Sequence, residues 1–114
     1  MSENKKLSAM ADEIIAGKIH LIRDKRVMLD RDLAYLYDIK AIRLREQVKR
    51  NLGRFPENFM FQLSAVEVNL LVSQNAIPSK KSLGGHLPYA FTEHGVLMLA
   101  NIIKTERAIE VSIR

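Results

Sequence analysis

The residues of this 114-residue chain whose types could do chemistry gather between Lys40 and Arg54. That segment holds six basic residues and one acidic residue, Glu46, so it carries the whole net charge of +5. The remaining twelve basic and twelve acidic residues cancel. The six basic residues are Lys40, Arg43, Arg45, Lys49, Arg50 and Arg54. A neutral body with one concentrated basic segment suits attraction to a phosphate backbone.

Helical spacing groups several of these side chains on one face. If the helix persists that far, Arg43, Arg50 and Arg54 fall within roughly 40° of each other, with Gln47 beside them. Arginine pairs with guanine O6 and N7, and glutamine or asparagine pairs with adenine N6 and N7. The face predicted to read bases in double-stranded DNA consists of Lys40, Arg43, Gln47, Arg50, Asn51 and Arg54.

Arg45 and Lys49 point away from that face and suit phosphates, which position a protein without specifying sequence. The alternative is a merely solvated helix face, although such faces usually mix charge signs at i,i+4 spacing. Lys80 and Lys81, with His86 nearby, predict a second DNA contact from a loop acting as an arm. The alternative there is an ordinary basic loop that binds nothing.

No residue pattern indicates catalysis. The three histidines, His20, His86 and His94, are scattered and lack the spacing of a zinc site. The run Thr92–Gly95 is better explained as a helix cap followed by an acid that matches the helix dipole. There is no cysteine, no glycine-rich phosphate loop after a strand, and no arrangement of serine, histidine and acid. We therefore expect a protein that is not an enzyme and uses no metal, cofactor or small-molecule substrate.

The elements that must position the basic segment begin with a short hairpin. Ile19–Ile22 and Val27–Leu29 are apolar runs that predict paired strands, and Asp24 can adopt the left-handed conformation that the turn needs. Asp30 is the expected N-cap of a helix that ends near Asp38. A second helix is expected from Lys40 to Leu52, where Gly53 suits its end. Its predicted buried stripe consists of Ala41, Leu44, Val48 and Leu52. Two short helices with a tight break predict a helix-turn-helix arrangement.

The second half of the chain predicts a further β-pair and C-terminal helices. Alternation over Phe59–Leu63 indicates a half-buried strand, which could pair with a strand at Leu87–Phe91. Ser64–Glu67 is a capping box that opens a helix to about Val72. Thr92 can cap a helix to Ile103, and Thr105 can cap a separate one to Ile113. The predicted fold is α+β: a β-hairpin, a helix-turn-helix-like pair, a second small β-pair, and C-terminal helices packed behind.

Composition bounds the organisation of the chain. Apolar residues make up 47% and charged residues 27%, as expected for one globular domain, here residues 14–114 after an N-terminal tail of 1–13. The longest apolar stretch, Gly95–Ile103, is roughly half as long as a membrane span. The absence of cysteine fits a reducing compartment. We expect a cytoplasmic protein, associated with the nucleoid of a bacterial cell and not with a membrane.

Several blocks of sequence together resemble a known family. They are Arg26–Asp30, Asp32–Ala34, Leu36–Tyr37, Gln47–Asn51, Arg54–Leu63 and Leu87–Val96. In this order they are similar to the ORF-six-N domain of the KilA-N superfamily, found in phage antirepressor-like and prophage-derived proteins, and the likeness extends from about Ile14 to Ile113. The resemblance implies a DNA-binding module in transcriptional or lysogeny regulation, and it supplies no catalytic residues.

The end of the chain suggests self-association. Ala108, Ile109, Val111 and Ile113 follow an already apolar helix and predict a homodimer through the C-terminal helices. The alternative is a last helix folded back onto its own core. The alternative function is a protein-interaction module that disarms another regulator by direct contact, which would need an exposed apolar surface.

Overall fold

A four-stranded antiparallel sheet lies at the centre of the computed structural model, which describes residues 17–83 and 85–113, with side chains described only up to Lys104. The strands are β1 (His20–Ile22), β2 (Lys25–Leu29), β3 (Met60–Gln62) and β4 (Tyr89–Phe91). Their order in the sheet is β1-β2-β4-β3. An antiparallel sheet packed together with helices confirms the α+β prediction.

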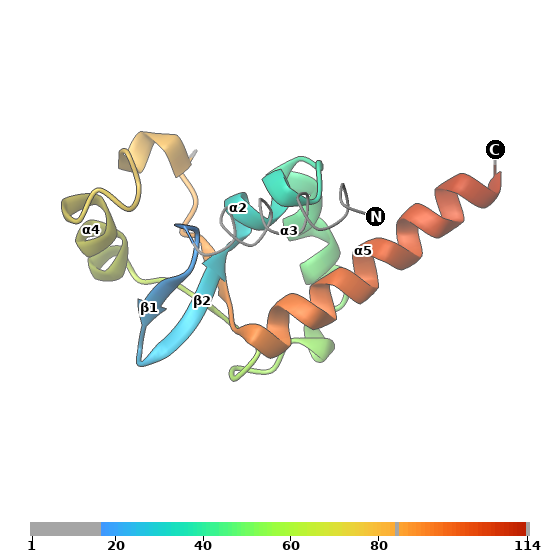
Figure 1. The fold of residues 1–114 in the computed structure, drawn as a ribbon, viewed down its shortest axis with the longest axis horizontal. Helices are drawn as coiled ribbons and strands as arrows, with labels where there is room; N and C mark the ends of the chain where they lie inside the picture. The colour runs from blue at the N-terminus through green and yellow to red at the C-terminus, as the bar shows by residue number, and fades with distance from the viewer. Residues whose placement is uncertain (1–16, 84, 114) are drawn as a thin grey trace, which may run out of the picture.

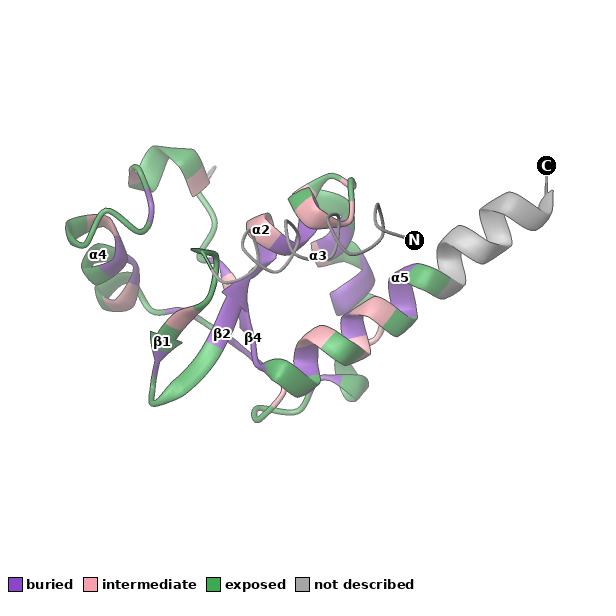
Figure 2. Ribbon diagram, in the orientation of Figure 1, coloured by how far each residue is buried: buried purple, intermediate pink, exposed green. Residues whose placement is uncertain are grey.

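Helices cover both faces of this sheet (Figure 1). They are α2 (Asp30–Leu36), α3 (Ala41–Arg50), α4 (Ala65–Ser73) and α5 (Glu93–Ile113), with short 3-10 turns η1 (Leu52–Arg54) and η2 (Lys80–Leu83). Figure 2 shows that the buried positions lie on the central strands and on the inward sides of the helices.

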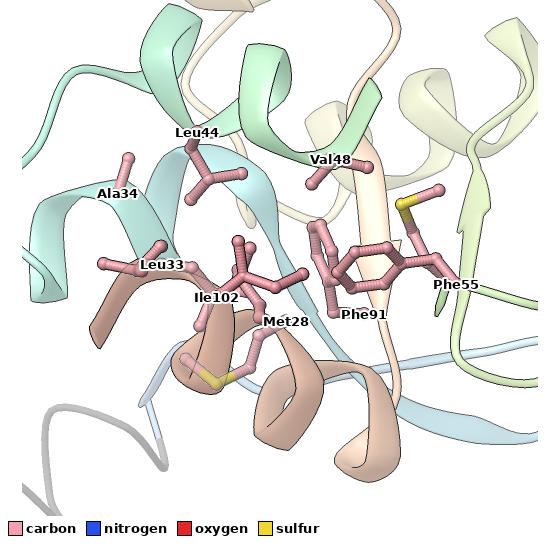
Figure 3. Close-up of a cluster of buried hydrophobic side chains, with 11 residues drawn as sticks. Met28, Leu33, Ala34, Leu44, Val48, Phe55, Phe91 and Ile102 are labelled. Carbon is pink, nitrogen blue, oxygen red and sulfur yellow. The ribbon is translucent and has the colours of Figure 1, made fainter. Parts of the chain in front are cut away.

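The first of two hydrophobic cores joins the sheet to α2, α3 and α5. Met28 and Phe91 from the sheet meet Leu44 and Val48 from α3, while Leu99, Ile102 and Ile103 of α5 complete the cluster (Figure 3). The rings of Phe55 and Phe91 meet edge to face with centroids 5.8 Å apart. This core fixes the position of α3 relative to the sheet.

The second core lies on the opposite face, where α4 packs. Val27, Leu29 and Ala90 contribute from the sheet, and Val68 and Ile77 close the cluster from α4 and the loop after it. Successive side chains of a strand point to opposite faces, so Met28 joins the first core while its neighbours join the second.

Two expectations about the strands are corrected. β3 is not half-buried, because Met60 enters the first core and Phe61 the second. The predicted pairing of β3 with β4 is confirmed, but it forms no separate β-pair. Phe91 is paired with Met60 on one side and with Met28 on the other, which joins β3 and β4 to the hairpin in one sheet.

The predicted hairpin is confirmed, with His20 opposite Val27. Both residues of its turn have positive φ, 54° for Arg23 and 61° for Asp24, as a type I′ turn requires. The Arg23 guanidinium donates to both carboxylate oxygens of Glu67 at 2.9 Å and lies 4.2 Å from the centroid of the Phe61 ring. These contacts hold a non-glycine residue in the left-handed region and fasten the hairpin to α4.

Glu67 also completes the capping box predicted for α4. The Glu67 N–H donates to Ser64 Oγ, and the Ser64 N–H donates to the Glu67 carboxylate. The helix ends with Asn75 at φ 60°, where the N–H of Ala76 donates to the Leu71 carbonyl. Asparagine therefore occupies the left-handed position that glycine often takes after a helix.

The C-terminal helix differs from prediction because α5 runs unbroken from Glu93 to Ile113. Thr105 does not cap a separate helix. No proline or glycine lies between Val96 and Ile113, and one threonine lowers helix propensity too little to end a helix. The start of α5 is as expected, with Thr92 Oγ1 accepting from the Gly95 N–H at 3.4 Å and donating to the Asn58 carbonyl at 2.8 Å.

Candidate nucleic-acid interface

The turn between α2 and α3 sets the direction of the basic helix. The N–H of Ile39 donates to the Ala34 carbonyl, and the N–H of Asp38 donates to the Tyr35 carbonyl. Asp38 has φ 56°, so the turn is a Schellman motif with aspartate at the usual glycine position. Ile39 packs against the core that contains Ala34, as this motif favours. Four residues, 37–40, thus separate the two helices.

The α2 helix begins differently from the prediction. Leu29 is its N-cap, and Asp30 is the first helical residue and is buried. Asp30 Oδ1 accepts from the Arg31 N–H at 2.7 Å, and Oδ2 accepts from the Tyr89 N–H at 3.2 Å. The carboxylate therefore joins the start of α2 to β4 and does not cap the helix with its side chain.

The exposed face of α3 is centred on Glu46. Leu44 and Val48 are buried, and at about 100° per residue the position opposite their midpoint is that of Glu46. Ile42, with 58% of its surface exposed, lies next to it. Lys49 lies on one side of this face and Arg43 and Arg50 on the other, all three exposed. Three cations thus surround one acid and one apolar side chain.

Gln47 is not on this face. Only 6% of its surface is exposed, and on the helix it lies between the exposed arginines and the buried side chain of Leu44. Asn51 is partly buried, and its side-chain amide donates to the Gln47 carbonyl at 2.9 Å. The amides predicted to read adenine are therefore placed in and beside the protein interior.

Arg45 is also only partly available. Its Nη1 lies 3.5 Å from Asp30 Oδ2, and its side chain is 20% exposed against 2% for that of Asp30. Burial raises the pKa of Asp30 above its ordinary value, while the backbone hydrogen bonds and Arg45 act in the opposite direction. The predicted phosphate ligand thus balances a buried carboxylate between α2 and α3.

The condition that the helix persists to Arg54 is not met. α3 ends at Arg50, Asn51 is its C-cap, and Leu52–Arg54 form η1. Leu52, predicted to be buried, is exposed, because the change to 3-10 geometry rotates it out of the stripe. Arg54 and Lys40 are exposed at opposite ends of α3.

Lys80 and Lys81 are exposed on η2, within what was expected to be an irregular loop. Arg31 Nη1 donates to Ser82 Oγ at 3.0 Å and thereby connects η2 to α2. A cavity of about 340 Å³ lies between the start of α3 and η2, with Ala41, Arg45, Ser82 and His86 in its lining. The structure therefore brings the second basic segment close to the flank of the first.

The sequence alone did not indicate that Ile42, Glu46 and Arg31 belong to the candidate interface. A helical wheel centred on Leu44 and Val48 places the first two on the exposed face, whereas nothing in the local sequence indicates that Arg31 meets η2.

None of the helices in residues 17–83 and 85–113 has the length and the apolar character of a membrane span.

Comparison with known proteins identifies the family. The family model of the ORF6N domain matches residues 17–102, which is most of the chain and includes α2, α3 and the whole sheet. Neither the comparison with curated proteins nor that with solved structures gave a match. The chain belongs to the ORF6N domain family, the phage antirepressor-like domains related to KilA-N.

Proposed function

We propose that this protein binds double-stranded DNA sequence-specifically through α3, as a phage- or prophage-derived transcriptional regulator or antirepressor. The observation that carries the proposal is the exposed face of α3, where Arg43, Lys49 and Arg50 project from the second of two helices joined by a tight turn. A helix-turn-helix protein inserts its second helix into the major groove. A binding role needs no metal, cofactor or small-molecule substrate, and it is carried out in the cytoplasm on nucleoid DNA.

The residues that would read bases are then those at and beside the centre of the exposed face. Glu46 can accept from the cytosine N4 amino group, and Ile42 can contact the methyl group of thymine. Arg43 and Arg50, which lie within about 20° of each other on the helix, can bind guanine O6 and N7 or phosphate. Lys49 suits the backbone on the other flank.

The experiment begins with selection of a preferred duplex from a random pool, followed by titration at several salt concentrations. Arg50→Ala should weaken binding to the selected duplex by about 1–3 kcal/mol and relax the preference at one base pair. Lys49→Ala should weaken binding to all duplexes similarly and reduce the salt slope by about one. Lys25→Ala, on the hairpin, is the matched loss of one positive charge. If Arg50→Ala and Lys49→Ala both bind like the parent while circular dichroism shows an intact fold, α3 is not the interface.

The second candidate function is direct contact with another regulatory protein. The outer side of α4 favours it, because Val66 and Leu70 are 68% and 55% exposed at i,i+4 spacing and Glu67 is the only charged residue of that helix. Added salt would change the affinity for a protein partner held by apolar contacts only little, whereas the affinity for DNA falls steeply with salt. The same salt series, with a candidate regulator in place of duplex, distinguishes the two functions.

A further inference from the structure

The cavity between α3 and η2 has a lining suited to an anion. Arg31, Arg45 and His86 border it together with the hydroxyl-bearing Ser82. Among the lining residues that the structure describes, Asp30 is the only acid, and the first turn of α3 contributes none. The lining is therefore basic, with one carboxylate to be accounted for.

The Asp30 carboxylate already has donors for both oxygens. The Arg31 N–H occupies Oδ1, while the Tyr89 N–H and Arg45 share Oδ2. Each guanidinium has five N–H donors, and the contacts described use Nη1 of Arg31 for Ser82 and Nη1 of Arg45 for Asp30. Donors on both arginines remain for a second acceptor, and guanidinium matches the geometry of phosphate oxygens.

The cavity also lies where a DNA backbone would pass. Ala41 starts α3, Arg45 follows one turn later, and Lys49 continues the same flank onto the exposed face. Lys80 and Lys81 are on η2, next to Ser82. A helix in the major groove has a phosphate backbone along each flank.

We propose that this cavity binds a phosphate group, namely a backbone phosphodiester of the strand that flanks α3, through Arg31 and Arg45. The inference rests on the proposed function for the identity of the ligand, because the same donors would also accept free phosphate. Arg31 is the new contact residue, and Ser82 holds it at the mouth of the cavity.

The first arm of the test measures the salt dependence of duplex binding. Arg31→Ala should reduce the slope by about one, as expected when one phosphate contact is lost. Lys25→Ala, on the hairpin, removes one positive charge outside the cavity, so its slope should equal that of the parent. If Lys25→Ala lowers the slope as much as Arg31→Ala does, or if Arg31→Ala leaves it unchanged, the proposal is overturned.

The second arm locates the phosphate. Single neutral methylphosphonates are placed along the selected duplex, and the one that occupies the cavity should weaken parent binding but no longer weaken Arg31→Ala. If no position shows this coupling, the backbone assignment is overturned.

The third arm omits DNA. Inorganic phosphate is titrated while the amide signals of Arg31, Ser82 and His86 are followed by NMR. Saturable shifts in the parent, absent in Arg31→Ala, support the anion site even if the parent binds no duplex, and in that case it is the proposed function that fails. Absence of both phosphate shifts and methylphosphonate coupling overturns the site itself.

Discussion

Substitution of Glu46 can distinguish base reading by α3 from simple attraction to phosphate. An acid at the centre of a face that meets DNA repels the backbone, and an accepted hydrogen bond from cytosine N4 can offset that repulsion. Glu46→Gln should therefore bind random duplex several-fold more tightly. It should also lose about 1–3 kcal/mol of discrimination at one cytosine position.

Competition between the selected and random duplexes measures both effects of Glu46→Gln. Asp24→Asn is the control, because it removes one negative charge from the hairpin turn and asparagine tolerates the left-handed conformation there. Unchanged discrimination in Glu46→Gln would show that the acid reads no base.

The ion pair of Asp30 and Arg45 should stabilise the fold, whether or not DNA is bound. Arg45→Met leaves a buried carboxylate without its counter-charge, which costs about 3–5 kcal/mol of unfolding free energy. The double variant Asp30→Asn, Arg45→Met should recover part of the loss, because the buried negative charge is also removed. Urea denaturation measures both. If the single variant is as stable as the parent, Arg45 does not stabilise the buried carboxylate, and its role would be DNA binding alone.

At the scale of elements, the link between the hairpin and α4 should weaken in acid. Hydrogen bonds from the Arg23 guanidinium, then from the Ser64 N–H, lower the pKa of Glu67 from 4.5 to about 2. Because the folded pKa is the lower one, the stabilisation is complete above about pH 4.5 and is lost as the pH falls toward 2. Burial raises the pKa of Asp30, so protonation of Asp30 acts in the opposite direction as the pH falls.

Glu67→Gln should remove this part of the pH dependence. It should also lower the unfolding free energy at neutral pH by only about 1 kcal/mol, because the pair is partly exposed and solvent screens it. Denaturation from pH 7 to pH 3 measures the effect, with Glu46→Gln as the control on an exposed acid. A parallel pH dependence of Glu67→Gln and the parent would contradict the assignment.

The first turn of α5 makes a close approach to the loop before β3. A Cβ on Gly95 would overlap the backbone carbonyl oxygen of Phe59, which also accepts the Thr92 N–H. Alanine at a helical glycine normally stabilises by about 0.5–1 kcal/mol. Here the overlap with backbone dominates, and Gly95→Ala should destabilise by about 1–3 kcal/mol. Gly53→Ala is the matched control, because its Cβ would meet nothing within 4 Å. Thermal denaturation in which Gly95→Ala melts no lower than Gly53→Ala would disprove the contact.

Local signals in the sequence predicted the elements better than their contacts. The hairpin turn at Asp24 and the capping box at Ser64 depend on neighbouring residues, and both were predicted. The pairing of β2 with β4 joins residues about sixty positions apart, so no local pattern indicates it. Burial of Gln47 likewise depends on what packs over α3. The site was therefore predicted at the level of the helix but not at the level of each side chain.

The basic segment 40–54 and the exposed apolar pair of α4, Val66 and Leu70, lie on different sides of the molecule. α3 packs against the sheet face opposite the one that α4 covers. The segment 40–54 carries the entire net charge, while α4 presents two exposed apolar side chains. Under the proposed functions, DNA on α3 and a protein partner on α4 would therefore not compete for one surface.

The course of α5 affects how the chain could associate with a second copy. The helix runs unbroken through Thr105 to Ile113, so no separate last helix turns back onto the core. The described core residues of α5, Leu99, Ile102 and Ile103, all precede Lys104. The predicted dimer residues 108–113 have side chains outside the described part, and their pairing stays a prediction.

A chain that ends at Lys104 should therefore keep its fold and lose only the predicted dimer surface. Light scattering at micromolar concentration should show a dimer for the full chain and a monomer for the shortened one. The full-length variant Ile109→Ser, Ile113→Ser should behave like the shortened chain. A dimer can place two copies of α3 about 34 Å apart, one turn of DNA, so a palindromic duplex should bind the full chain more tightly than a single half-site does. If the parent and every variant are monomers, with and without that duplex, the dimer prediction is wrong. The α3 of a single chain would then contact one half-site alone.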